Sequence, residues 1–388
     1  MNIGIFFGSR SPEHDVSIIT ASLVMNTLAK LNYKVTPIYI SEKGEWFVSE
    51  DIKDLNLVTL TKANKEVNSN FKKIYLDLEN SFGKMVFKRK GINRKEITID
   101  IAFPCFHGSF GEDGTIQGLF ELLSVPYVGC NVQASVVAMD KILSKRFAES
   151  LGVPTSRFTN LTTIRKIENI SELKDTMSGK DLTFPLFVKP PKLGSSIGIT
   201  KVNNLEELNN AIEVAFHYDR SALVEESVEN TRDLTVCLIG NKEIITSEIQ
   251  ESAFSKDMYS YEDKYLENGG SQIGNNTKKL IIPAEIDKDI AKKIKEDARK
   301  LYLNLECKGM ARFDFLLNDK TGEYFFSEIN PLPGTIYSHL WAKSGITLEQ
   351  LVTKLVEYAK EEYEEKQKVT YVFNSTILSN LKGLKFGK

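Results

Sequence analysis

Two runs of alternating apolar and polar residues near the carboxyl end of the chain predict an antiparallel hairpin. The runs cover residues 309–317 and 323–330 and are rich in Phe, Leu and Ile. Period-two alternation is typical of strands that bury one face. The segment NDKTG at residues 318–322 separates the two runs and predicts the turn.

The predicted hairpin gathers oxygen atoms on one face. Side chains two positions apart in a strand share a face, so a turn centred on Thr321 sets Asp314 opposite Glu328. The same register sets Arg312 opposite Asn330. Two carboxylates and an amide oxygen suit Mg²⁺, which binds one or two carboxylates together with substrate phosphates. For this stretch on its own, a half-buried hairpin with a solvated polar face remains the alternative.

The first 40 residues predict a parallel α/β unit. An apolar run at 3–7 leads into GSRSPEHDVS, a helical pattern runs through residue 31, and a second strand follows at 35–40. Loops at the carboxyl ends of parallel strands bind ligands in open α/β sheets, so Glu13 is a site candidate. The alternative is that Glu13 only caps the helix. Residues about 50–97 are polar and weakly periodic, and we interpret them as an elaboration of this unit without chemistry of its own.

Two glycine-rich loops follow later strands. Residues 100–106 predict a buried strand that opens into HGSFGEDG, and three glycines around His107 make a tight loop ahead of a helix. Further along, Lys189 ends a predicted strand in LFVKPPKLGSSIG. This spacing is not that of a Walker A loop, but a lysine beside successive Gly and Ser backbone N–H groups can grip phosphate oxygens. A plain Gly/Ser hairpin turn is the alternative. Residues 222–228 predict a strand that runs into a linker, where an adenine could lie between two domains.

The composition indicates a globular protein with two or three packed domains. The chain has 388 residues, 41% of them hydrophobic, and a net charge of −2. Its 50 basic and 52 acidic residues give no positive field for nucleic acid. A basic leader and a membrane-length apolar run are missing, so we expect a cytoplasmic protein without membrane association. The four cysteines lack CxxC spacing and are expected to be reduced core residues.

The chain resembles the D-alanine–D-alanine ligases of the ATP-grasp superfamily from residue 1 to about residue 365. Five motifs occur in the family's order: GSRSPEHDVS, HGSFGEDG, VKPPKLGSSIG, YSYEDKY, and GMARFDFLL with EINPLPG. The resemblance implies an α/β fold of three domains, with an N-terminal open parallel sheet and an α+β central unit. The implied domains are an N-terminal substrate-side domain at 1–139, a central ATP-grasp domain at 140–227 and a C-terminal ATP-grasp domain at 228–388.

The resemblance also implies a role for each matching residue. For ATP it implies that Lys141 and Lys189 bind the phosphates and that Glu225 lies near the adenine. It also implies that Asp233 binds the ribose and that Lys264, on a mobile loop, helps to close over the phosphates. For two Mg²⁺ ions, with Mn²⁺ as an alternative, it implies the ligands Asp314, Glu328 and Asn330. Over the first D-alanine it implies a hydrogen-bonded trio of Glu13, Ser195 and Tyr265. It implies that His107 lies beside the second amino acid. It also implies that Arg312 and the Gly334 backbone N–H stabilise the oxyanion that forms during the reaction.

The activity implied by the resemblance joins two D-alanines through an acyl phosphate and supplies peptidoglycan precursors. The resemblance also suggests a homodimer formed through the N-terminal domain. A nucleotide-binding protein without turnover is a rival hypothesis, but the matching residues are intact. A tail from about residue 366 has no assigned counterpart.

The chain departs from the family pattern after EINPLPG. It continues TIYSHLW, so without a gap His339 takes the place of a serine that binds the second substrate's carboxylate. A one-residue shift would give that role to Ser338. Histidine is bulkier and can carry charge near neutral pH, which would make the second-substrate KM depend on pH. A related carboxylate–amine ligase with another second substrate is therefore the alternative function.

Overall fold

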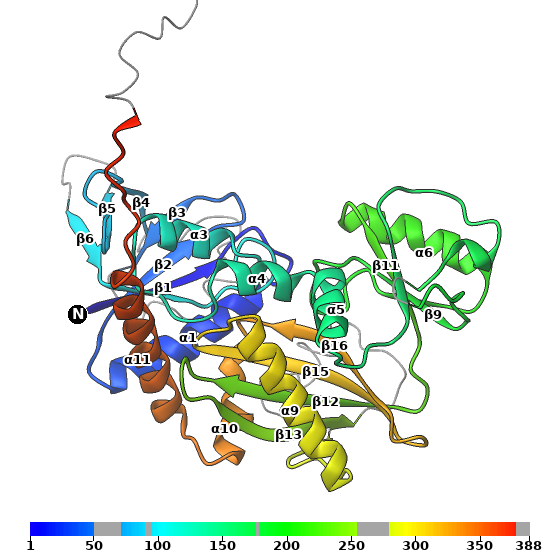
Figure 1. Ribbon diagram of the computed structural model, residues 1–388. Helices are drawn as coiled ribbons and strands as arrows, with labels where there is room; N and C mark the ends of the chain where they lie inside the picture. The colour runs from blue at the N-terminus through cyan, green and yellow to red at the C-terminus, as the bar shows by residue number, and fades with distance from the viewer. Residues whose placement is uncertain (50–70, 90–94, 176–177, 254–278, 378–388) are drawn as a thin grey trace, which may run out of the picture.

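The computed structural model describes residues 1–49, 71–89, 95–175, 178–253 and 279–377, and it contains three sheets joined by helices (Figure 1). Within these ranges, no helix is long and apolar enough to cross a membrane. All four cysteines are buried and free, which confirms the expectation of core thiols.

The first sheet has seven strands in the order β6-β5-β4-β3-β2-β1-β7. Its strands are β1 (Asn2–Gly8), β2 (Lys34–Ile40), β3 (Trp46–Val48), β4 (Lys72–Leu76), β5 (Met85–Arg89), β6 (Glu96–Ile99) and β7 (Ile101–Pro104). The predicted parallel sheet is present at its centre, where β1 pairs in parallel with β2 and β7. The remaining pairs are antiparallel. The weakly periodic region thus contributes three neighbouring strands at one side of the sheet, β4, β5 and β6, that the sequence pattern did not reveal.

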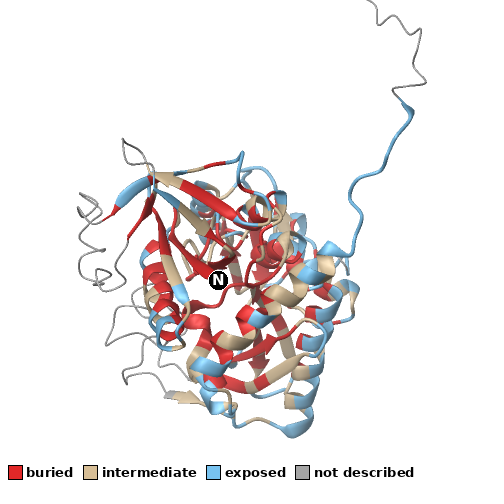
Figure 2. Cartoon of the chain, turned by 90° about the vertical axis from the view of Figure 1, so that its left-hand side faces the viewer, coloured by how far each residue is buried: buried red, intermediate tan, exposed pale blue. Residues whose placement is uncertain are grey.

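Helices from both ends of the chain cover this sheet (Figure 1). They are α1 (His14–Lys30), α3 (Thr115–Leu122) and α11 (Leu348–Gln367). Apolar residues of the sheet and of the first and last helices, such as Ile5, Val24 and Leu355, belong to one buried cluster. The last long helix therefore packs on the N-terminal unit. Beyond it, residues 369–377 extend from the body with exposed side chains (Figure 2).

The central unit is a four-stranded antiparallel sheet in the order β10-β9-β11-β8, with its own buried cluster. The strands are β8 (Phe158–Leu161), β9 (Leu186–Lys189), β10 (Thr200–Val202) and β11 (Ala222–Glu226). Its other elements are the short 3₁₀ turn η2 (Ile170–Glu172) and α6 (Leu205–Tyr218). Helices α4 (Val132–Met139) and α5 (Lys141–Ser150) lead into it from the first unit (Figure 1).

The third sheet has the order β14-β13-β12-β15-β16 and carries the predicted hairpin. Its strands are β12 (Thr231–Ile239), β13 (Ile245–Ala253), β14 (Lys279–Ile281), β15 (Met310–Asn318) and β16 (Tyr324–Asn330). Helix α9 (Lys288–Asn304) packs on it, and η4 (Gly334–Tyr337) and α10 (Ser338–Lys343) follow the last strand. The predicted register is confirmed: Asp314 pairs with Glu328 and Arg312 with Asn330.

Candidate active site

The adjacent strands β12, β15 and β16 bring a polar cluster together around Asp314. Arg312 Nε and Nη2 lie 3.0 and 2.7 Å from Asp314 Oδ2. Asn330 Nδ2 donates to the same oxygen at 3.1 Å, and Thr235 Oγ1 donates to Asp314 Oδ1 at 2.8 Å. The sequence missed Thr235, although its place on the neighbouring strand β12, opposite Asp314, accounts for the contact. Every polar neighbour of this carboxylate is held by the sheet, so its position is fixed.

The charge balance of this cluster fits a bound cation. Burial and the Glu328 carboxylate raise the pKa of Asp314, although Arg312 opposes the shift. A cation between two carboxylates would favour their ionised forms. Among the described residues no group of three His, Cys, Asp or Glu side chains forms a closed metal cage. Two carboxylates and the Asn330 amide form instead the open donor set that Mg²⁺ accepts with phosphate oxygens.

Three lysines from the central unit face two carboxylates, the buried Glu225 and the half-buried Glu328. Lys141, at the start of α5, pairs with Glu328 at 2.9 Å and donates to the Leu193 carbonyl. Lys189, at the end of β9, pairs with Glu225. Lys145 pairs with the same carboxylate at 2.8 Å. The structure thus brings together the two lysines predicted to bind phosphate and the acid predicted near the adenine.

Glu225 is a carboxylate held between two ammonium groups. Burial alone raises its pKa, but Lys145 and Lys189 outweigh burial and hold the pKa well below its usual range. Ser156 Oγ also donates to Glu225, at 2.8 Å. Sequence reasoning missed Lys145; its signal was the i, i+4 spacing from Lys141, which sets both lysines on one face of α5.

The Gly/Ser loop of the central unit reaches the first loop of the N-terminal unit. Ser195 Oγ donates a short hydrogen bond to Glu13 Oε1. Glu13 precedes α1, but its side chain does not cap the helix. A Cβ on Gly194 would lie 2.7 Å from Glu13 Oε2, so a larger residue there would displace the Glu13 carboxylate. Of the predicted trio, two members are in contact; Tyr265 lies outside the described residues, as does Lys264.

His107 and Gly334 meet where the N-terminal unit contacts the loop after β16. His107 is buried, and its Nε2 lies 2.8 Å from Thr20 Oγ1. Burial and the positive charge of Arg312 lower the pKa of His107 to about 3, so the ring is neutral. Gly334 begins η4, and the N–H of the next residue, Thr335, donates to Thr20 Oγ1 at 3.0 Å.

His339 faces the interior rather than solvent. Its Nε2 lies 2.7 Å from Gln250 Oε1, and its ring is 4.9 Å from that of Tyr337. Burial and Arg312 lower the pKa of His339 to about 4, so the expectation of a charged histidine near neutral pH is wrong. Ser338 precedes it as the first residue of α10 and is half-buried.

Asp233 lies on β12, two residues before Thr235. Side chains two apart in a strand share a face, so Asp233 continues the polar face of the hairpin toward the linker to the central unit. It is half-buried.

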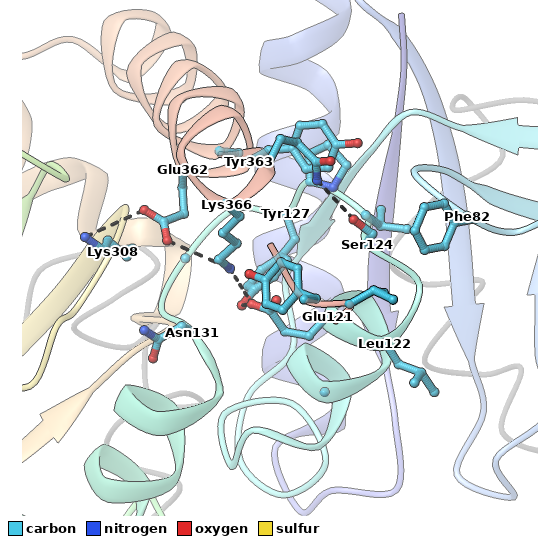
Figure 3. Close-up of a pocket in the computed structure, with 18 residues that line it drawn as sticks. Phe82, Glu121, Leu122, Ser124, Tyr127, Asn131, Lys308, Glu362, Tyr363 and Lys366 are labelled. Carbon is cyan, nitrogen blue, oxygen red and sulfur yellow. Dashed lines mark hydrogen bonds and ion pairs between the residues drawn. The ribbon is translucent and has the colours of Figure 1, made fainter. Parts of the chain in front are cut away.

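A cavity of about 630 Å³ lies away from this cluster, between α3 and the end of α11 (Figure 3). Its lining contains none of the predicted site residues. Charged pairs cross it: Lys308 lies 3.6 Å from Glu362, and Lys366 pairs with Glu121. Lys366 also lies over the Tyr127 ring. Glu121 and Tyr127 belong to the N-terminal unit and Lys308 to the third unit, so these contacts fasten the last helix to both units.

Comparison with known proteins gives one consistent result. The family model described as D-ala D-ala ligase N-terminus matches residues 2–130, and that described as D-ala D-ala ligase C-terminus matches residues 147–357. The D-alanine–D-alanine ligase of Chloroherpeton thalassium is 37% identical over 374 residues, which cover 94% of this chain and 98% of that protein. The corresponding ligase of Thermosipho africanus is 37% identical over 379 residues, 97% and 98% of the two chains.

Solved structures are similar along almost the whole chain. The D-alanine–D-alanine ligase from Coxiella burnetii has a TM-score of 0.78 at 27% identity and covers 95% of this chain and 96% of that one. The VanG D-Ala:D-Ser ligase from Enterococcus faecalis has a TM-score of 0.76 at 30% identity, with 92% and 99% covered. The similar proteins therefore include ligases that differ in their second substrate.

Proposed function

The chain belongs to the D-alanine–D-alanine ligase family, and on that basis we propose how its side chains join two D-alanines at the expense of ATP. It is an ATP-dependent ligase with the ATP-grasp fold, it uses a divalent metal ion, and its product serves cell-wall synthesis. The observation that carries the residue assignments is the cluster around Asp314, where one carboxylate meets Arg312, Asn330 and Thr235.

The proposed first step transfers the γ-phosphoryl group of ATP to the carboxylate of the first D-alanine. A carboxylate oxygen attacks phosphorus, ADP leaves, and an acyl phosphate forms. Phosphoryl transfer requires mainly positioning and charge from the protein. Lys141 and Lys189 are assigned to the phosphates, because each already holds a carboxylate that phosphate oxygens can replace. Glu225 and Asp233 are assigned to the nucleoside side, and Lys264 to the loop over the phosphates.

Asp314, Glu328 and Asn330 are the proposed ligands of two Mg²⁺ ions, with Mn²⁺ as an alternative. When bound, such ions neutralise charge on the transferring phosphoryl group. Arg312 would keep Asp314 oriented, since it binds that carboxylate through two nitrogens.

The proposed second step forms the peptide bond. The amine of the second D-alanine attacks the acyl carbonyl carbon, the amine loses a proton, and inorganic phosphate leaves. The tetrahedral intermediate carries an oxyanion, which we assign to Arg312 and the Gly334 N–H. Glu13, Ser195 and Tyr265 are assigned to the first D-alanine, which fits the Ser195 to Glu13 contact. His107 is assigned to the side of the second amino acid.

Steady-state phosphate release tests the function directly. With ATP, Mg²⁺ and D-alanine we expect ADP, phosphate and D-alanyl-D-alanine in equal amounts, with the dipeptide identified by mass spectrometry. ATP binding without D-alanine-dependent phosphate release would instead favour a nucleotide-binding protein without turnover. Dipeptides formed only when a different second amino acid is supplied would favour the related carboxylate–amine ligase.

The choice of second substrate depends on the residues that follow Gly334. We propose D-alanine, and the alternative of another second amino acid rests on the His339 to Gln250 pair. A neutral imidazole bonded to a buried amide offers no positive charge to a carboxylate. Ser338 or a backbone group would then bind that carboxylate, and His339 would shape the pocket.

His339→Ser is expected to change the ranking of second amino acids without changing the pH profile. Because burial and Arg312 lower the pKa of His339 to about 4, the second-substrate KM should show no imidazole inflection between pH 6 and 8 in either protein. A screen of D-amino acids at fixed ATP measures the ranking, with Ser338→Ala tested beside it. If His339→Ser changes no ranking while Ser338→Ala raises the second-substrate KM, the altered-pocket idea fails.

The proposal also covers the domain division, the oligomeric state and the location of the protein. We propose the three-part division at 1–139, 140–227 and 228–388, with the exception that α11 packs on the first part. We also propose a homodimer, and a cytoplasmic location where ATP is available. Small-angle scattering at several concentrations would test the oligomeric state.

A further inference from the structure

The loop that carries Gly334 is held at both ends by side chains of the N-terminal unit. Thr20 Oγ1, on α1, accepts the N–H of Thr335 at 3.0 Å. The same oxygen lies 2.8 Å from His107 Nε2. His107 also bonds the backbone of Leu332. A continuous path of hydrogen bonds therefore joins Leu332 to Thr335, on the two sides of Gly334.

The direction of each hydrogen bond follows from the donors present. The Thr20 oxygen accepts from the Thr335 N–H, so its own hydrogen is available for His107 Nε2. A neutral ring that accepts at Nε2 carries its proton on the other nitrogen and donates it to the Leu332 carbonyl. The low pKa of His107 agrees with a neutral ring. The Leu332 carbonyl can only accept, so it sets the tautomer of His107, and Nε2 then accepts the hydrogen bond from the Thr20 hydroxyl.

Glu112 holds the same loop from a second direction. Its Oε1 accepts the Leu332 N–H at 3.3 Å, and its Oε2 accepts the Gly108 N–H at 2.7 Å. Leu332 is therefore bound at its N–H by Glu112 and at its carbonyl by His107. The residue after Gly334 is bound by Thr20. Three side chains that the sequence separates widely from residues 332–335 fix this segment.

The segment needs such support because its continuation is strained. Thr335, Ile336 and Tyr337 have φ values of 49°, 48° and 49°, a left-handed run of three residues that are not glycine. Strained backbone of this kind persists only where the surroundings over-determine it. The Tyr337 ring lies against the Arg312 guanidinium, 5.0 Å from ring centre to Cζ. The position of the strained turn therefore also affects the Arg312 guanidinium.

We propose that Thr20 and Glu112 are positioning residues for peptide-bond formation. This inference rests on the proposed function, because it assigns them to the Gly334 N–H and to Arg312. They act through residues 332–335, which they bind directly. Loss of either residue should slow attack on the acyl phosphate more than its formation, so that water intercepts the intermediate.

The test compares phosphate release with dipeptide formation in Thr20→Val. Valine keeps the shape but removes the hydroxyl, and we expect kcat for dipeptide to fall at least tenfold while the KM for ATP changes less than twofold. The ratio of phosphate released to dipeptide formed should rise above one. Thr20→Ser, which keeps the hydroxyl, should restore most of the rate and the ratio. Thr27→Val is the matched control: Thr27 is also buried on α1, but its hydroxyl donates to Leu23 within the helix.

Two outcomes separate this inference from the proposed function. If the wild-type protein forms no dipeptide, the function itself is wrong. If the wild type is active and Thr20→Val matches Thr27→Val in rate and ratio, the positioning role is wrong. Should Thr20→Val fail to fold, Glu112→Gln decides, since an amide keeps only one acceptor oxygen for two N–H groups. A well-folded Glu112→Gln with a ratio of one would overturn the proposal, and a raised ratio would support it.

Discussion

Asp314→Asn is expected to lower kcat for dipeptide formation by at least about 100-fold. The substitution keeps the shape of the side chain but removes the charge of a proposed metal ligand. It also replaces an acceptor oxygen by an amide nitrogen beside Arg312, Asn330 and Thr235, which all donate to this carboxylate. The loss should appear in ADP formation, since the metal acts on the phosphoryl group.

The measurement is ADP release with D-alanine over a range of Mg²⁺ concentrations. Asp319→Asn is the matched control, because Asp319 lies in the turn of the same hairpin and binds Arg232 at 2.9 Å. The control should keep the wild-type rate. A near-normal kcat in Asp314→Asn at any Mg²⁺ concentration would show that the hairpin does not bind the metal. The proposed roles of Glu328 and Asn330 as metal ligands would then also be wrong.

The hairpin could be predicted from the sequence because its information is local. The alternation of apolar and polar residues shows which side chains share a face of each strand, and the short turn shows which two strands pair. The sequence alone therefore predicts that Asp314 lies opposite Glu328. The structure adds a register shift after Asp314, beyond the functional pairs. Strands such as β4 and β5 could not be predicted because lysines interrupt their alternation of apolar and polar residues.

Contacts between distant segments could not be predicted in the same way. Thr20 and Thr335 are 315 residues apart, and neither local sequence contains a pattern that predicts the hydrogen bond between them. The charge state of His339 was also not predictable, because a pKa depends on burial and neighbours that sequence does not display. The family resemblance supplied many of the site residues, but the hydrogen bonds that orient them required the structure.

Arg312→Lys is expected to reduce kcat for dipeptide formation by about 100-fold or more, the typical effect of removing one oxyanion donor. Lysine keeps the charge but loses the planar fork with which Arg312 binds Asp314 through two nitrogens. It also loses the flat surface that packs against the Tyr337 ring. The remaining ammonium cannot hold Asp314 and face the oxyanion at the same time.

The step that fails distinguishes this variant from the metal-site variant. A single-turnover experiment at saturating Mg²⁺ should show ADP formation close to normal in Arg312→Lys and dipeptide formation strongly delayed, whereas Asp314→Asn should fail already at ADP. Arg232→Lys is the control, because Arg232 binds Glu251 and Asp319 on the same sheet, away from the cluster. If Arg312→Lys loses ADP formation and dipeptide formation equally, Arg312 acts mainly by orienting Asp314. Its assignment to the oxyanion would then be wrong, and the Gly334 N–H would remain as the proposed donor at that position.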